Sequence, residues 1–187
     1  MAQYVEPSPL PPLNRYITTH DASGKAIVSD SIPSEAKWTA AGKEAKFFLG
    51  YCTSTSPVSL AGDQDIQTYD GYRTAAPGLV VPGGTVLRVV DVAPGHLSPM
   101  HRTASLDYGV VLEGEVELVL DSGETRVMRR GDTCVQRGTN HAWRNTSGAE
   151  WARMLYVLVE ASPVVLDSGV KLEEDLGDMQ GVRKSAA

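Results

Sequence analysis

Two histidines are candidates for chemistry, because the chain has only four and these two lie in its most regular segment. His101 comes just before a predicted strand, and His141 directly follows a turn. An imidazole can take up and return a proton near neutral pH, and it is also a common metal ligand. Either residue alone would be interpreted as a packed or surface histidine. Their shared placement in one strand-rich segment favours a common site.

The elements that must position these histidines follow a strand pattern from Gly78 onward. Residues 115–120 read Glu-Val-Glu-Leu-Val-Leu, which alternates polar and apolar side chains apart from Val119, and Asp121-Ser122-Gly123 then turns the chain. Alternation of this kind, broken by regularly spaced turns, is typical of an all-β sandwich or barrel. The predicted strands occupy residues 85–92, 107–120, 124–136 and 141–159.

The segment before Gly78 is less regular. It predicts a hairpin with strands at 15–19 and 26–29, a helix over 35–44, a strand over 46–53 and a polar, turn-rich stretch over 54–77. We therefore divide the chain into four parts. These are a flexible Pro-rich arm at 1–13, an N-terminal extension at 14–77 that packs on the barrel or on a dimer partner, the barrel at 78–165, and a C-terminal tail at 166–187.

Composition and charge narrow the class of protein. The net charge of −6 argues against a nucleic-acid partner, and the densest basic cluster, Arg126 with Arg129 and Arg130, is interpreted as a solvated hairpin edge. The chain shows neither a signal peptide nor an apolar run that could span a membrane, so we expect a cytoplasmic protein without a membrane partner. Cys52 and Cys134 fit no metal-binding spacing and are expected to stay reduced.

Two segments of the barrel region resemble the conserved motifs of the cupin superfamily. Residues 95–114 read Gly-His-Leu-Ser-Pro-Met-His-Arg-Thr-Ala-Ser-Leu-Asp-Tyr-Gly-Val-Val-Leu-Glu-Gly, and Gly95, His101, Asp107 and Gly114 fall on the register of the first motif. Residues 131–145 resemble the second motif, which ends in a histidine, three residues and an asparagine. The resemblance covers residues 78–160 and implies a double-stranded β-helix (jelly-roll) barrel with an N-terminal strand extension. The residues of both segments are similar to those of small cupins of fungi and bacteria, and the fungal members often act in secondary metabolism.

The resemblance also implies a site, although the chain departs from the family pattern. Thr103 stands where a second motif-one histidine is usual, and Asp107 replaces a glutamate. His101, Asp107 and His141 remain, and they suit either a divalent metal such as iron, zinc or manganese, or a metal-free acid–base set. Since aspartate is one methylene shorter than glutamate, we favour the metal-free interpretation, in which the histidines exchange the proton and Asp107 orients them or supplies charge.

Five further residues are candidates for substrate binding within the implied barrel. A guanidinium that points inward could hold a carboxylate or an enolate, and a hydroxyl or an indole could line the pocket. The candidates are Thr103, Arg88, Arg102, Trp143 and Arg153. His96, on the loop that leads to His101, could line the mouth of the barrel.

The resulting functional hypothesis is an enzyme acting on a small molecule such as a polyketide-like or hydroxy-acid intermediate. The reaction would be decarboxylation, dehydration or isomerisation, so the enzyme would be a lyase or an isomerase. A metal-dependent dioxygenase or oxidoreductase is the first alternative, and a non-catalytic cupin that binds a small ligand is the second. Because small cupins commonly dimerise, we also expect a homodimer.

Overall fold

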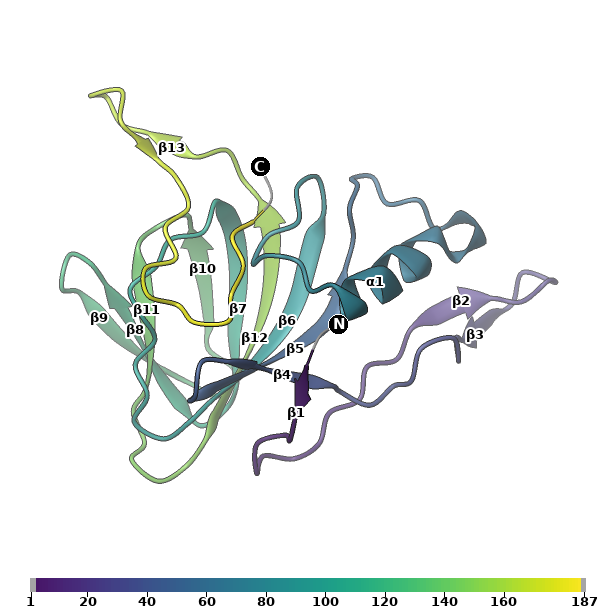
Figure 1. Cartoon of the computed structure of the whole chain (residues 1–187), viewed down its shortest axis with the longest axis horizontal. Coiled ribbons are helices and arrows are strands. Elements are labelled where there is room, and N and C mark those ends of the chain that lie inside the picture. The colour runs from purple at the N-terminus through teal and green to yellow at the C-terminus, as the bar shows by residue number, and fades with distance from the viewer. Residues whose placement is uncertain (1–2, 186–187) are drawn as a thin grey trace.

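The structure is a computed structural model that describes residues 3–185, and its two larger antiparallel sheets face each other (Figure 1). One sheet has seven strands in the order β1-β4-β5-β6-β12-β7-β10, and the other has the order β11-β8-β9. The strands after Gly78 are β6 (Thr85–Val92), β7 (Ser105–Glu113), β8 (Glu115–Leu120), β9 (Thr125–Arg129), β10 (Thr133–Arg137), β11 (His141–Asn145) and β12 (Ala152–Glu160).

These strands confirm the all-β prediction, and β6 has the predicted bounds. The predicted run 107–120 is divided at Gly114, whose φ is 76°. A Cβ atom at this position would lie 3.2 Å from Ala152, so the chain passes between sheets where only glycine fits without strain. Below the mouth, the barrel is filled by a buried apolar cluster of Val111, Val116, Met128, Trp143, Ala152 and Met154.

The N-terminal half differs from the prediction in two places. The hairpin is present as β2 (Thr18–His20) and β3 (Ala26–Val28), and the predicted strand over 46–53 is β5 (Ala45–Cys52). The helix predicted over 35–44 is wrong, because this segment contains β4 (Trp38–Ala41), which pairs with β5. Burial of Trp38 against Phe48 outweighs the local helical preference, since tertiary packing overrides propensity in short segments.

The turn-rich stretch over 54–77 contains a helix that the sequence pattern did not predict. After a 3-10 turn at Ala61–Asp63, α1 (Gln64–Thr74) lies against the sheet at the side opposite β9 (Figure 1). Only Ile66 and Tyr69 are buried along the helix. Because a stripe of two residues gives little periodic signal, tertiary contact rather than an amphipathic pattern positions this helix.

The Pro-rich arm lies on the outer face of the larger sheet rather than free in solvent. β1 (Tyr4–Val5) pairs with β4, and Ser8 is buried and donates a hydrogen bond to Asp91. This placement differs from the flexible arm expected at 1–13, because backbone pairing and one buried polar contact anchor the segment. Residues 1–2 of the arm, like residues 186–187 of the tail, lie outside the described residues.

The C-terminal tail crosses the barrel after a small hairpin made of β13 (Val164–Val165) and β14 (Lys171–Leu172) (Figure 1). The backbones of Arg102 and Asp175 form two N–H···O bonds of 2.6 and 2.9 Å, and Leu176 is buried. At Gly177 an added Cβ would lie 2.6 Å from the carbonyl oxygen of Met100. The tail therefore crosses the loop before His101 in close contact.

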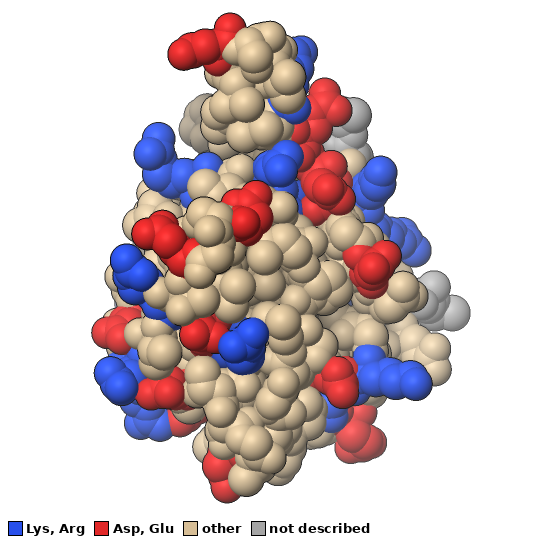
Figure 2. Space-filling model, turned by 90° about the vertical axis from the view of Figure 1, so that its left-hand side faces the viewer, with Lys and Arg blue, Asp and Glu red and all other residues tan. Residues whose placement is uncertain are grey.

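The surface carries charges of both signs. Figure 2 shows Lys/Arg and Asp/Glu interspersed around a broad uncharged area on the side where β8, β9 and β11 lie. Arg126, Arg129 and Arg130 are exposed beside glutamates, as predicted for a solvated hairpin edge. Among residues 3–185, no helix is long and apolar enough to cross a membrane.

Candidate active site

A cavity of about 590 Å³ lies inside the barrel and opens between the two sheets. Strands β6, β7, β11 and β12 contribute to its wall, and residues 41–45 and 178–180 contribute to its rim. The structure brings six of the predicted site residues together here: Arg88, His101, Thr103, Asp107, His141 and Trp143.

His101 and His141 are neighbours because their backbones pair across the barrel. The N–H of each donates to the carbonyl of the other, over 2.8 and 2.9 Å, and their ring centroids lie 4.3 Å apart. Nδ1 of His101 lies 2.9 Å from the carbonyl oxygen of Pro99. Since a carbonyl can only accept, this contact places the His101 proton on Nδ1 and leaves Nε2 as an acceptor.

The surroundings of His141 keep it uncharged. Its Nδ1 lies 3.0 Å from the carbonyl oxygen of Thr139 and 3.0 Å from Nε2 of Gln136. Burial, and then the charge of His101, lower the pKa of His141 to about 3, and burial lowers the pKa of His101 as well. Both rings are therefore neutral near pH 7. Trp143 packs edge-on against His141, with ring centroids 5.5 Å apart.

Asp107 is the acidic group of the cavity. It is 5% exposed, and its Oδ2 accepts a hydrogen bond of 3.3 Å from Thr103, whereas Oδ1 is buried without a partner. Burial raises the pKa of Asp107 to about 6, against the opposing effects of its hydroxyl neighbours and of Arg88. A carboxylate of this pKa can accept a proton at neutral pH and give it back readily.

Arg88 supplies a positive charge beside this carboxyl group. Its guanidinium is buried, donates to the carbonyl of Gly78 over 3.0 Å and lies 5.0 Å from the ring centroid of Phe47. Burial lowers the pKa of Arg88 to about 10, which still leaves it charged at pH 7. The cavity thus combines two neutral imidazoles, one carboxyl group near its pKa and one cation.

Comparison with known proteins agrees with this architecture. The family model described as "Cupin domain" matches residues 88–158. The chain is 43% identical to "Cupin-domain-containing oxidoreductase fogC" of Aspergillus ruber, over 88% of this chain and 80% of that one. This chain belongs to the cupin family. The cupin is also 54% identical to "Phomopsin biosynthesis cluster protein D" of Diaporthe leptostromiformis, over 82% of each chain. It is 42% identical to "Oryzines biosynthesis cluster protein J" of Aspergillus oryzae, over 91% of this chain and 94% of that one.

The structure places two predicted substrate-binding residues of the cupin away from the cavity. Arg153 points to the outer face of the sheet, where its Nε and Nη2 pair with Asp91 over 2.6 and 2.7 Å. Its Nη1 also donates to the carbonyl of Pro11, so it anchors the arm. Arg102 donates to the carbonyl of Glu173 in the tail over 3.3 Å. Both were predicted from residue type. The register of β12 directs Arg153 to the outer face, and Arg102, which precedes β7, is held by its backbone bridge to Asp175 of the tail.

Several lining residues were missed by the sequence interpretation. Tyr156 and Leu158 follow Met154 at alternate positions of β12, so the period of two could have identified them. Gln136, which contacts His141, sits on β10 one residue from the recognised motif turn. His96 lines the rim as expected and pairs with Glu44 over 2.7 Å. Nothing in the sequence of residues 178–180 predicts that this part of the tail lies at the rim of the cavity.

The donor set does not fit the divalent metal that the family implies. Within residues 3–185, no three His, Cys, Asp or Glu side chains lie close enough together to hold a metal ion. Asp107 has Thr103 as its hydrogen-bond partner, and Thr103 replaces the fourth family ligand. These donors therefore line one cavity without converging on one point, as the positions of His101, Asp107 and His141 show.

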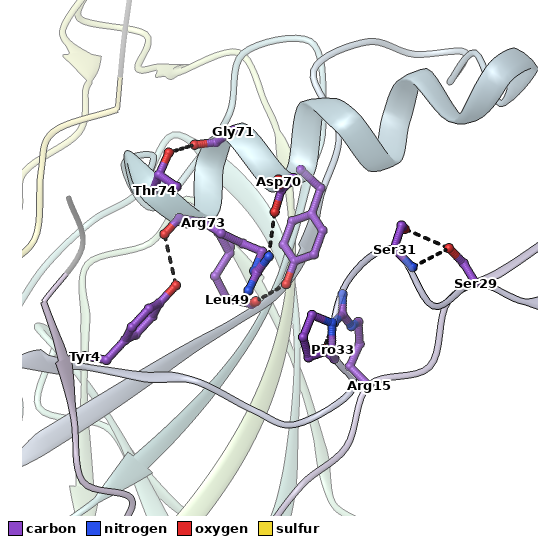
Figure 3. Close-up of polar contacts among 11 residues, drawn as sticks. Tyr4, Arg15, Ser29, Ser31, Pro33, Leu49, Asp70, Gly71, Arg73 and Thr74 are labelled. Carbon is purple, nitrogen blue, oxygen red and sulfur yellow. Dashed lines mark hydrogen bonds and ion pairs between the residues drawn. The ribbon is translucent and has the colours of Figure 1, made fainter.

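A second, smaller cavity of about 100 Å³ lies between α1, the arm and the outer part of the sheet. Figure 3 shows polar contacts around it, among them the pair of Arg73 with Asp70 over 2.5 Å. Tyr69 donates to the carbonyl of Leu49 over 2.8 Å. Tyr4 donates to the carbonyl of Arg73 over 3.2 Å. Arg15 stacks over Tyr69 with its guanidinium carbon 5.1 Å from the ring centroid. These contacts hold α1 and the arm on β5.

Proposed function

We propose that this cupin is an enzyme of secondary metabolism that moves a proton on a small organic molecule, as a lyase or an isomerase. One observation carries the proposal: two uncharged histidines and a carboxyl group with a pKa of about 6 line the same cavity. Groups whose environments drive their pKa values apart are the usual basis for assigning acid and base roles. The relatives from named biosynthesis clusters support the metabolic setting.

We assign the proton transfer to Asp107 rather than to the histidines, which the sequence analysis had expected to exchange the proton. An imidazole whose pKa is lowered by burial is a weak base, whereas Asp107 is half ionised near pH 6. Asp107 takes a proton from a substrate carbon, and the electron pair of that C–H bond moves onto the adjacent carbonyl oxygen. A hydrogen bond from neutral His141 and the charge of Arg88 stabilise this enolate.

The fate of the proton distinguishes the possible reactions. In an isomerisation, Asp107 returns it to a different carbon of the substrate. In a dehydration, the proton leaves with the departing hydroxyl group as water. In a decarboxylation, loss of CO₂ generates the enolate, and protonated Asp107 delivers its proton to the same carbon. All three require an enolisable carbonyl, and none changes the oxidation state of the enzyme.

The cavity indicates the substrate class. Its wall is mainly aromatic and aliphatic, with Phe47, Trp143 and Tyr156 among its residues, and its volume suits a molecule with one or a few rings. A carboxylate or an acidic enol would pair with Arg88. We therefore propose a largely apolar intermediate with one enolisable and acidic end.

An oxidoreductase is the second candidate function, and the names of relatives from Aspergillus ruber and Hypocrea virens favour it. One experiment separates the two. The gene is deleted in the organism that carries it, the accumulating compound is isolated, and purified protein is incubated with it in D₂O under air. We expect a product without net oxidation, which carries deuterium on carbon after an isomerisation or a decarboxylation and has lost one water after a dehydration. A product that has lost two hydrogens or gained oxygen, with consumption of O₂, would establish the oxidoreductase instead.

A further inference from the structure

The side-chain amide of Gln136 contacts Nδ1 of His141 and leaves Nε2 of that ring free. Gln136 is 4% exposed, on β10 directly opposite Asp107 of β7. Its Nε2 lies 3.0 Å from Nδ1 of His141 and 3.1 Å from the carbonyl oxygen of Thr139, and it also contacts Oγ1 of Thr139. A buried amide with this many polar neighbours restricts which of them can carry a proton.

Three atoms form a closed triangle: Nε2 of Gln136, Nδ1 of His141 and the carbonyl oxygen of Thr139. All three sides measure 3.0 or 3.1 Å. If His141 carries its proton on Nδ1, it donates to Thr139 but faces an amide N–H of Gln136. If Nδ1 is bare, Gln136 donates to both neighbours and Nδ1 faces the carbonyl oxygen. Each tautomer satisfies two sides, so the triangle alone leaves the two nearly balanced.

His101 breaks this balance. Its Nδ1 has a carbonyl partner, Pro99, so its Nε2 is an acceptor. The two rings line the same cavity with centroids 4.3 Å apart. A second bare Nε2 would leave two adjacent rings, both lining the cavity, with acceptors only and no donor between them. An N–H on Nε2 of His141 removes this conflict.

We propose that Gln136 is a positioning residue that holds His141 as the Nε2–H tautomer, opposite to the Nδ1–H tautomer of His101. The pair then presents one acceptor and one neutral donor to the cavity. In the reaction proposed above, on which this role rests, His141 donates a hydrogen bond to the enolate oxygen and His101 accepts one from a substrate hydroxyl. A neutral imidazole can act in this way beside a carboxylate base.

Nitrogen NMR of the whole protein tests the tautomers without a substrate. Long-range ¹H–¹⁵N spectra separate protonated from bare ring nitrogens, and the chain's four histidines are assigned through single His→Asn variants. We expect His101 protonated on Nδ1 and His141 on Nε2 at pH 7.5. A proton on Nδ1 of His141 in the wild-type protein would overturn the proposal.

Two matched variants test whether Gln136 is the cause. A carboxylate can only accept, so Gln136→Glu should move the His141 proton to Nδ1 and leave His101 unchanged. Gln67→Glu makes the same chemical change on the exposed side of α1 and should alter neither ring. An unchanged His141 tautomer in folded Gln136→Glu would refute the role of Gln136. If that variant does not fold, Gln136→Met, which removes the amide donor, should also shift the proton to Nδ1.

Turnover provides a separate readout once the substrate is isolated. Loss of the Nε2–H donor in Gln136→Glu should lower kcat about 10²-fold, as for removal of one oxyanion donor, with a smaller change in KM. Unchanged kcat in a variant whose tautomer has shifted would refute the catalytic role. Should the reaction prove to be an oxidation, the proposed function would fail while the NMR assignment would stand or fall on its own spectra.

Discussion

Replacing Asp107 by asparagine should stabilise the protein at alkaline pH even though it removes the proposed base. Burial raises the pKa of Asp107 from 3.8 to about 6 in the folded protein. A raised pKa means that folding favours the protonated form. Its contribution to stability is fully present below pH 3.8 and is lost as the pH rises through about 6. Asparagine resembles the protonated carboxyl group in shape and has no charge to desolvate.

The size of the effect follows from the two pKa values. At about 1.4 kcal/mol per pKa unit, the raised pKa of Asp107 lowers the free energy of unfolding by about 3 kcal/mol at pH 8 and by about 0.6 kcal/mol at pH 4. The free energy of unfolding of Asp107→Asn, relative to the wild-type protein, should therefore rise by about 2.4 kcal/mol between pH 4 and pH 8. Titration of His141 is common to both proteins and largely cancels in this difference.

Urea unfolding followed by tryptophan fluorescence at pH 4, 6 and 8 measures this difference. Asp167→Asn, at an exposed position beside β13, is the matched control and should show the wild-type pH dependence. A stability difference between Asp107→Asn and the wild-type protein that stays constant from pH 4 to 8 would show that the carboxylate is not desolvated. This result would contradict the assignment of Asp107 as a base near neutral pH.

Four further outcomes are expected. Asp107→Asn should lower kcat/KM by about 10²- to 10⁴-fold, and wild-type kcat/KM should fall as the pH drops below about 6, which a pH–rate profile measures. Because the pKa of His141 is lowered to about 3, wild-type stability should fall by about 2.3 kcal/mol more than that of His141→Asn between pH 6.5 and 4.5 in urea titrations. Prolonged chelation should leave turnover unchanged, and added iron, zinc or manganese should restore none to Asp107→Glu; metal-specific rescue would contradict the metal-free site. Light scattering should give a homodimer of twice the 20.0 kDa chain mass, and Val135→Glu, beside exposed Tyr108 at the β10 edge, should shift it toward monomer.

The barrel half was predictable because its signals are local. Turn residues such as Asp121-Ser122-Gly123 delimit strands whose alternation places one face inward, so β8 ends at the predicted residue, Leu120. The motif spacing placed His101, Asp107 and His141 in one cavity. In the N-terminal half, β4 pairs with β5 across the turn at 42–44, a local hairpin that the sequence interpretation missed. The pairing of β1 with β4 and the packing of α1 involve partners distant in the chain, which a window of neighbouring residues does not contain.

The sequence did not predict which face of the sheet is occupied by each of the two arginines on the paired strands β6 and β12. Arg88 and Arg153 both lie in apolar runs, yet Arg88 faces the cavity and Arg153 faces the arm. The arm covers the outer face of the sheet, where Leu155 of β12 and Val89 of β6 pack in an apolar cluster with Leu13. These strands are therefore apolar on both sides, and their alternation does not reveal which side is the interior.

Residue identities and spacing alone determined the fold class and the chemical groups available to the site. The tertiary structure decided their chemical states. Burial makes both histidines neutral and brings the pKa of Asp107 to about 6, and register brings Gln136 against His141. A pKa and a tautomer depend on which atoms surround a group and how much water they exclude, and those neighbours come from strands distant in sequence.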